Sequence, residues 1–303
     1  MKKWINMLWV LVLVNVGVQL VSRIVSLPFA LLLLVLLPVA FALVHGALRY
    51  RWSGILTFIV ICLVVSNLLE NSSILTGFPF GHYYYTDQLG PKLFLVPLII
   101  GPAYFSTGYL AWVLGTVLVG EVRRQGNWLT TFAVPFIASF LMVAWDLSFD
   151  PASSTIGHRW IWQQGGGYFG VPFTNYLGWF FTVYVFFQLF ALFLRFRRAS
   201  NDGEAKVLSR SYYAQVVVMY AAISLAFVLS YVVGGGGNTL VTDAAGVVWH
   251  TASITEAEAT VSIFTMLFGA ALSMVKLLQG PTAVTSTAVE AEAAIKKRTP
   301  VIG

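Results

Sequence analysis

Eight stretches of mostly apolar residues constrain this sequence more than any other feature; they cover roughly residues 4–22, 27–46, 54–69, 93–119, 128–147, 174–195, 212–233 and 259–278. About 20 apolar residues cross the hydrocarbon core of a bilayer as a helix. Only 10% of the 303 residues are charged, whereas a soluble domain carries about 25%. The sequence therefore predicts an all-α, polytopic membrane bundle of about eight transmembrane helices. We expect one domain over residues 1–280 and a disordered polar tail over residues 281–303.

The distribution of Lys and Arg predicts the orientation of these spans. With the N-terminus in the cytoplasm, 15 of the 18 basic residues lie inside, and only Arg23, Lys92 and Arg159 lie outside. Cytoplasmic loops of membrane proteins carry an excess of Lys and Arg. We therefore expect a multi-pass cell-membrane protein with both termini in the cytoplasm, and no nucleic-acid partner despite the net charge of +6. The long connections 70–92, 148–173 and 234–258 then share the outer side.

Two aspartates at the outer end of the fifth stretch are the first candidates for chemistry. Asp146 and Asp150 are four residues apart, so on a helix they lie on one face. An ionised group at membrane depth costs about 2.5–3.5 kcal/mol. We expect Asp146 inside the apolar layer and Asp150 at its edge, before Pro151 ends the helix. Either Asp146 pairs with a buried donor such as Arg159, or the two carboxyl groups keep one proton between them.

Glu70 is a third candidate, because it is the only acid in the first 86 residues. It ends the third stretch on the predicted outer side, at the same membrane level as Asp146. A helix-terminal glutamate that faces water explains it equally well. We expect the acids and the histidine of the third long connection to be solvated; these are Asp243, His250, Glu256 and Glu258.

Aromatic residues are dense in the first two long connections. Tyr and Trp form belts at membrane surfaces, but a dozen rings also suit the wall of a site for a long apolar ligand. Such a wall stabilises a carbocation by up to about 2 kcal/mol for each desolvated cation–π contact. The rings are Phe78, Phe80, Tyr83, Tyr84, Tyr85, Trp160, Trp162, Tyr168, Phe169, Phe173, Tyr176 and Trp179.

Several cofactor chemistries are disfavoured by the motifs that are missing from the sequence. The four histidines are too scattered for the clusters of membrane di-iron oxygenases, and Cys62 is the single cysteine. The sequence contains no dinucleotide-binding or nucleotide-phosphate motif and no nucleophile elbow. The Asp146-x-x-x-Asp150 motif resembles the diphosphate-binding motifs of membrane prenyltransferases, but a second motif is absent. We expect neither a metal nor a cofactor.

Two blocks of the sequence resemble a known family. The first block contains Glu70, Gly77-x-x-x-Gly81-x-Tyr83-x-Tyr85-Thr86, Leu89-Gly90-Pro91-Lys92-Leu93 and Val96-Pro97-Leu98. The second contains Trp145-Asp146, Asp150-Pro151, Trp160-x-Trp162, Gly167-Tyr168-Phe169-Gly170-Val171-Pro172 and Asn175-x-x-Gly178-Trp179. In this order they resemble the CruF-type carotenoid 1,2-hydratases, membrane proteins of carotenoid biosynthesis that include bisanhydrobacterioruberin hydratase.

The resemblance implies a cofactor-independent hydro-lyase that adds water across the terminal C=C bond of an acyclic carotenoid, lycopene-like or C50, to give a tertiary alcohol. This chemistry needs a desolvated acid, walls that tolerate a cation, and a positioned water molecule. We predict Asp146 as the proton donor, Asp150 as its partner and Glu70 as the third acid. The predicted substrate-binding residues are Tyr83, Tyr85, His158, Trp160, Trp162, Asn175 and Trp179. Membrane lipid and other enzymes of the pathway are candidate partners.

Two other functions stay compatible with the sequence. A membrane lycopene cyclase-type enzyme shares the first protonation step, after which an internal double bond captures the cation. A non-catalytic carotenoid or lipid carrier needs the aromatic slot but not the acids.

Overall fold

Seven helices that are long and apolar enough to cross a membrane make up the computed structural model, which describes residues 2–124, 126–197, 208–234 and 237–279. They are α1 (Lys2–Val21), α2 (Ala30–Thr76), α3 (Ile100–Val119), α4 (Trp128–Pro151), α5 (Phe173–Phe196), α6 (Arg210–Val232) and a last helix formed by α7 (Thr251–Val261) and α8 (Phe268–Gln279). A π-helical segment, Ser262–Leu267, joins α7 to α8. The prediction of an all-α polytopic bundle is confirmed. The predicted tail at 281–303 lies outside the described residues.

The helix α2 contains two spans. It has 47 residues, about twice the length that a bilayer requires. At Arg51 the backbone leaves the helical conformation, with φ 65° and ψ 169°. Val35 from the first part and Glu70 from the second part line the same cavity, whereas a straight helix would hold them about 50 Å apart. The chain therefore folds back near Arg51, and the bundle contains the eight predicted spans.

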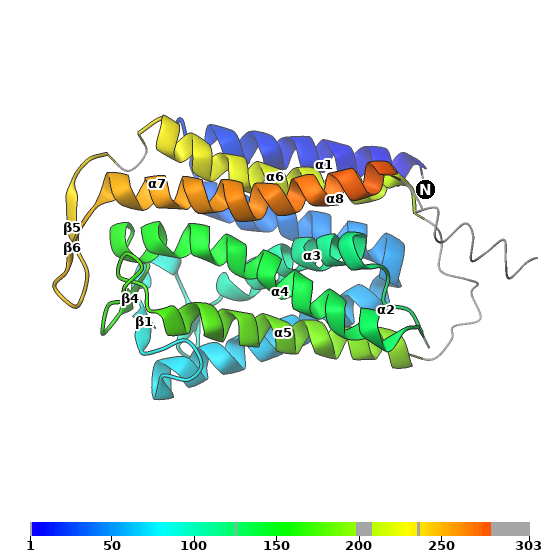
Figure 1. Ribbon diagram of the computed structural model, residues 1–303, viewed down its shortest axis with the longest axis horizontal. Coiled ribbons are helices and arrows are strands. Elements are labelled where there is room, and N and C mark those ends of the chain that lie inside the picture. Colours follow the sequence, from blue (N-terminus) through cyan, green and yellow to red (C-terminus); the bar gives the residue numbers. More distant parts are fainter. Residues whose placement is uncertain (1, 125, 198–207, 235–236, 280–303) are drawn as a thin grey trace, which may run out of the picture.

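The helices run side by side along the long axis of the molecule (Figure 1). The helix α1 packs against α2 and α6, and α3 packs against α2, α4 and α6. The strands β1 (Tyr83–Tyr85), β4 (Trp160–Trp162), β5 (Leu240–Thr242) and β6 (Val248–His250) gather at the end of the bundle opposite the N-terminus. The three long connections therefore meet at one end, as their predicted placement requires.

Three predicted helix boundaries are wrong. The third span continues to Thr76, because Asn71 and Thr76 bond back to the backbone of the helix and Gly77, at φ 82°, ends it. Glu70 is consequently inside the helix. The fourth span begins at Ile100, because Lys92–Leu93 (β2) pairs with Val96–Pro97 (β3). The last span begins at Thr251, which shortens the third connection.

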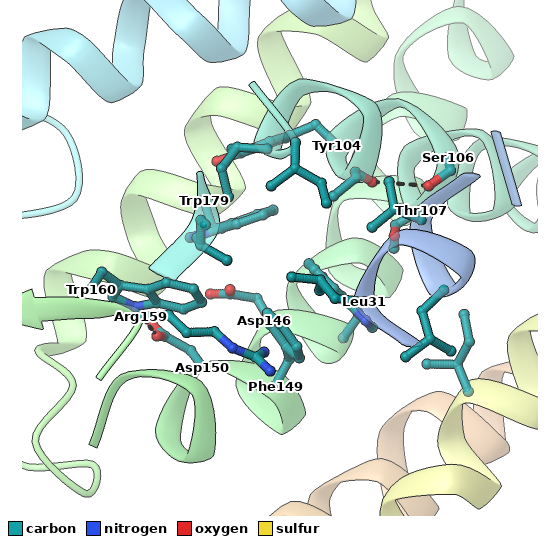
Figure 2. A pocket seen from close by; sticks show the side chains of 18 of the residues that line it. Leu31, Tyr104, Ser106, Thr107, Asp146, Phe149, Asp150, Arg159, Trp160 and Trp179 are labelled. Carbon is teal, nitrogen blue, oxygen red and sulfur yellow. Dashed lines mark hydrogen bonds between the residues drawn. The ribbon is translucent and has the colours of Figure 1, made fainter. Parts of the chain in front are cut away.

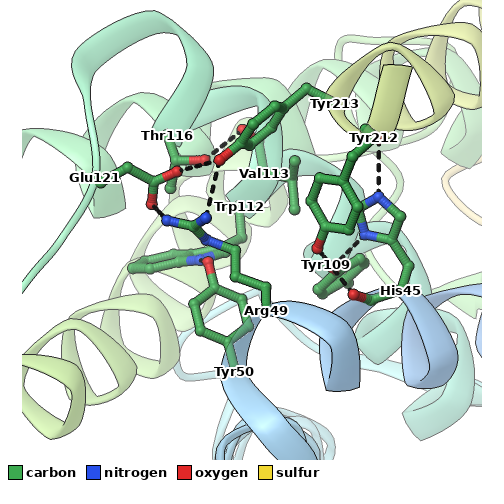
Figure 3. A network of polar contacts seen from close by, with 10 residues as sticks. All are labelled: His45, Arg49, Tyr50, Tyr109, Trp112, Val113, Thr116, Glu121, Tyr212 and Tyr213. Atoms are coloured by element: carbon green, nitrogen blue, oxygen red, sulfur yellow. Dashed lines mark hydrogen bonds and ion pairs between the residues drawn. The ribbon is translucent and has the colours of Figure 1, made fainter. Parts of the chain in front are cut away.

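Buried polar side chains fasten the turn of α2 near Arg51 to α3 and α6 (Figure 3). Arg49 forms an ion pair with Glu121. The His45 ring lies between the Tyr109 hydroxyl, 2.6 Å from Nδ1, and the Tyr212 carbonyl oxygen, 2.9 Å from Nε2. Buried polar groups need such partners to offset the loss of water. This network ties the end of the first half of α2 to α3 and α6 at the end of the bundle away from the strands.

Candidate active site

A cavity of about 300 Å³ lies where the strands β1 and β4 meet the bundle. Its walls come from α1, α2, α3, α4, α5 and α6 as well as from the two strands. Glu70 on α2 and the two aspartates Asp146 and Asp150 on α4 all line it, so the three predicted acids share one space although they come from two separate helices. In Figure 2, Asp150, Arg159 and Trp160 lie together on one side of the view, away from Ser106 and Thr107 on the other.

The two aspartates form a pair at the end of α4. Asp146 and Asp150 are 2% and 1% exposed, so both carboxyl groups are buried inside the protein. The chain continues past Pro151 as a π-helical turn, Ala152–Ile156, which covers Asp150. Asn175, in the first turn of α5, donates from Nδ2 to Asp146 Oδ2 at 3.0 Å and to Asp150 Oδ2 at 2.7 Å. One amide group therefore holds both carboxyl groups side by side.

Asp150 has a further donor. Trp160 Nε1 lies 2.6 Å from Asp150 Oδ1, so Asp150 accepts hydrogen bonds from two side chains and Asp146 from one. Hydrogen bonds donated to a carboxylate favour its ionised form. Because Asp150 accepts more hydrogen bonds than Asp146, the negative charge of the pair is favoured on Asp150 and the proton of the pair on Asp146.

Glu70 is surrounded by three phenol groups. Tyr85 donates to Oε2 at 2.9 Å, Tyr104 donates to Oε1 at 2.7 Å, and Tyr83 also donates to Oε2. Glu70 is only 3% exposed, so the prediction of a common site with Asp146 fits the structure better than a water-facing helix end. Burial, followed by the charge of Glu70, raises the pKa of Tyr83 and of Tyr85 well above its usual value, and both remain donors.

A two-stranded antiparallel sheet, formed by β1 and β4, links Glu70 to the Asp146–Asp150 pair. Tyr83 pairs with Trp162 and Tyr85 pairs with Trp160. Alternate residues of a strand lie on the same face, so Tyr83 and Tyr85 both reach Glu70. The opposite strand brings Trp160 to Asp150. Two loops about 75 residues apart are thus joined by a sheet that supplies donors to both Glu70 and the aspartate pair.

Aromatic faces form much of the cavity wall. The rings of Tyr104 and Trp179 are stacked with centroids 4.4 Å apart and planes at 4°. Trp145 meets Trp179 edge-on at 5.9 Å, and Phe149 lies 6.0 Å from Trp160. Stacked and edge-to-face rings hold one another in place. Their faces present negative electrostatic potential to a cation in the cavity.

Arg159 and Arg23 also line the cavity. The structure does not place Arg159 in the alternative role of ion-pair partner to Asp146. Its Nη1 lies 3.4 Å from Ser153 Oγ, and its guanidinium lies 6.0 Å from the centre of the Phe149 ring. Arg23 lies between α1 and α2 and interacts electrostatically with Glu258. Both guanidinium groups keep their charge at any ordinary pH, which offsets part of the negative charge nearby.

One known protein family matches most of this chain. The sequence model of a family described as carotenoid biosynthesis protein matches residues 29–242. The chain belongs to this family. Its members act in carotenoid biosynthesis, and the match includes Glu70, Asp146, Asp150 and Asn175. The protein is thus a membrane protein with a role in carotenoid biosynthesis.

Among individual relatives, this carotenoid biosynthesis protein is similar to a bisanhydrobacterioruberin hydratase from Haloarcula japonica. The two are 31% identical over 112 residues, which cover 37% of this chain and 36% of the relative. The aligned stretch thus spans about a third of the hydratase. No solved structure matches the chain significantly.

Nine of the ten predicted site residues line the cavity of this carotenoid biosynthesis protein. They are Glu70, Tyr83, Tyr85, Asp146, Asp150, Trp160, Trp162, Asn175 and Trp179. The tenth, His158, is exposed and lies outside it; its carbonyl oxygen accepts a hydrogen bond from Thr86 at 2.8 Å. The structure therefore gives His158 a part in joining the two loops and does not bring its ring to the acids.

The sequence analysis did not identify Tyr104 and placed Glu258 wrongly. Tyr104 lies inside a long apolar stretch, where a tyrosine is an ordinary helix residue, so no sequence pattern singled it out. Glu258 was expected in a solvated loop, but it is buried on α7 and its Oε1 accepts the Ala152 N–H at 2.8 Å. It supports the turn that follows Pro151 and does not line the cavity. Asp243 accepts from Trp249 Nε1 at 2.9 Å and organises the β5–β6 turn.

In the described part of the chain, no three His, Cys, Asp or Glu side chains are grouped closely enough to hold a metal ion. What the cavity offers chemically is a pair of adjoining carboxyl groups, a third carboxyl group held by phenols, and aromatic walls. These groups are suited to moving protons near a short-lived cation.

Proposed function

We propose that this carotenoid biosynthesis protein adds water across the terminal C=C bond of an acyclic carotenoid end group. The observation that carries the proposal is the buried Asp146–Asp150 pair, bridged by Asn175 inside an aromatic cavity. Two carboxyl groups this close do not both ionise readily, so the pair retains a proton in an apolar setting. The name of the relative from Haloarcula japonica supports the same reaction class.

The residues fit the successive steps of an acid-catalysed hydration. Asp146 transfers its proton to the less substituted alkene carbon, which leaves a tertiary cation on the neighbouring carbon. The faces of Trp160, Trp179 and Tyr104 stabilise that cation. A water molecule then adds its oxygen to the cation and loses a proton, so the product gains one H and one OH. Asp150, fixed by Asn175 and Trp160, positions Asp146 and tunes its acidity.

Expression in a host that accumulates an acyclic carotenoid tests this function. The expected pigment has the mass of the substrate plus one water, and the substitution Asp146→Asn abolishes it. An altered pigment of unchanged mass would mean that an internal double bond captures the cation, as in a cyclase. An unaltered pigment that copurifies with the protein would favour a carrier.

The cavity is too small to enclose a polyene whose length rivals the thickness of a bilayer, so only an end group fits beside the acids. Its far side is lined by apolar residues, among them Leu31, Leu34, Val35, Leu110 and Phe227. We propose that the polyene leaves the cavity along this side and reaches the lipid. An acyclic carotenoid is then drawn directly from the membrane.

A bulky side chain on this apolar wall is expected to reduce hydration. Val35 is 8% exposed and lines the cavity, so Val35→Trp fills the space for the polyene. We expect product formation to fall about tenfold or more, which corresponds to a loss of roughly 1.4 kcal/mol. Leu36, 47% exposed on the same helix, is the matched control, and Leu36→Trp should leave hydration unchanged. Equal losses in both variants would show that the polyene does not use this wall.

The basic residues supply the proposed orientation, with both termini in the cytoplasm and the acidic cavity at the outer side. A reporter fused after Leu278 is expected to be active only in the cytoplasm, and one inserted at Gly246, in the β5–β6 turn, only outside. The opposite pattern of activity would invert the orientation and place the acids at the cytoplasmic surface.

A further inference from the structure

Glu70 accepts hydrogen bonds from three side-chain hydroxyl groups, which sets it apart from the two aspartates. The donors are Tyr83, Tyr85 and Tyr104, and they occupy both carboxyl oxygens. A carboxylate accepts several such bonds, whereas a protonated carboxyl group turns one of its oxygens into a donor. Three phenol donors therefore favour the ionised form of Glu70.

The phenol groups are held in place by structure around them. Tyr83 and Tyr85 are fixed by the β1–β4 sheet, and Tyr104 is stacked on Trp179. Charge-assisted hydrogen bonds of this kind are about twice as strong as neutral ones. The three held donors thus favour the carboxylate form of Glu70 against the cost of its burial, inside the cavity that also holds the aspartate pair. Its carboxylate is a base, while the Asp146–Asp150 pair holds the acid.

Resting on the proposed hydration, we propose that Glu70 is the catalytic base that binds the attacking water and removes its proton. The Asp146 carboxyl group gives its proton to the alkene, and a new C–H bond forms. The water oxygen forms a C–O bond with the tertiary cation, and one of its O–H bonds breaks as the proton passes to a Glu70 oxygen. The product carries the added H and OH, Asp146 is left as a carboxylate, and Glu70 is left protonated.

One further proton transfer closes the cycle. The proton on Glu70 must return to Asp146, and both groups line the same cavity. Tyr104 donates to Glu70 and shares that space, so its hydroxyl or a water molecule is suited to relay the proton. No net proton enters or leaves the site, and one water is consumed for each double bond.

Incubation of the full-length protein with lycopene in heavy water separates the acid from the base. Protonation of the alkene, followed by loss of a proton from the cation, returns a polyene that carries deuterium without any added oxygen. In Glu70→Gln the acid is intact, so we expect deuterated polyene to persist while hydrated product falls by about 10²–10⁴-fold. In Asp146→Asn both the deuterated polyene and the hydrated product should be lost.

The ratio of hydrated product to deuterated polyene is the decisive readout, because a general loss of folding lowers both together. Tyr104→Phe removes one of the three donors and should lower this ratio less than Glu70→Gln does. Glu258→Gln is the matched control, because Glu258 is a buried acid that lies outside the cavity. The amide oxygen of the new glutamine can still accept the Ala152 N–H, so the ratio should be unchanged.

Three results would overturn the assignment. Normal hydration in Glu70→Gln would show that another group takes the proton from water. The second is that Glu70→Gln loses deuterated polyene and hydrated product in parallel, while Tyr104→Phe leaves the ratio of hydrated product to deuterated polyene unchanged. Glu70 would then be a structural residue or the acid itself. If the wild-type protein neither hydrates nor deuterates the polyene, the proposed function fails, and the role of Glu70 fails with it.

Discussion

Replacement of Asp146 by Asn is expected to abolish hydration while the protein still inserts and still binds the polyene. Asparagine keeps the shape of the side chain and can still accept the hydrogen bond from Asn175, but it has no proton to give to an alkene. Loss of an essential proton donor typically costs 10²–10⁴-fold in rate. Analysis of pigments extracted from cells that express equal amounts of each variant measures this loss.

The control for Asp146→Asn is Asp150→Asn, which should be less severe. In the proposed mechanism Asp150 only tunes its neighbour, so Asp146 should keep its proton when the second charge is removed. If hydration is near normal in Asp146→Asn but lost in Asp150→Asn, the roles within the pair are reversed. If neither change matters, acid catalysis at this pair is excluded.

A methyl group added at Gly178 is expected to destabilise the protein and disturb the site at once. Gly178 is in α5, and a Cβ there would lie 2.6 Å from the carbonyl oxygen of Pro79 and 2.7 Å from its carbonyl carbon. Backbone atoms cannot rotate away, so Gly178→Ala pushes the loop before β1 off the helix. Overpacking of this kind typically costs about 1–3 kcal/mol. Because the loop leads into Tyr83, hydration should fall with stability.

The thermal midpoint of the purified protein in detergent measures this effect. Gly17→Ala in α1 is the matched control, since a Cβ at Gly17 meets no atom within 4 Å. Alanine also has the higher helix propensity, so this control should be as stable as the wild type or slightly more stable. A wild-type midpoint in Gly178→Ala would show that the loop does not pack against α5 as described.

The span pattern and the aspartate pair were predictable from sequence for a simple reason. Membrane spans carry their signal in about 20 consecutive residues, and the four-residue spacing of Asp146 and Asp150 fixes a common helix face. Both signals are local. The buried position of Asp150 was not predictable, because it depends on the π-helical turn that continues past Pro151.

The surroundings of Glu70 depend on contacts that the sequence does not encode locally. Three-residue strands such as β1 and β4 are too short to show a period, so their pairing across about 75 residues left no pattern. Tyr104 reaches Glu70 only because α2 and α3 pack together. Glu258 looked solvated because polar and small residues around it hid the early start of α7.

The source of the added oxygen tests the central claim most directly. The purified protein in lipid vesicles is incubated with lycopene and water labelled with heavy oxygen, without molecular oxygen, and the product mass is recorded. Acid-catalysed hydration predicts a tertiary alcohol that carries the heavy oxygen from water, formed by the wild type and not by Asp146→Asn. A product of unchanged mass, or an alcohol formed equally well by Asp146→Asn, would contradict the account.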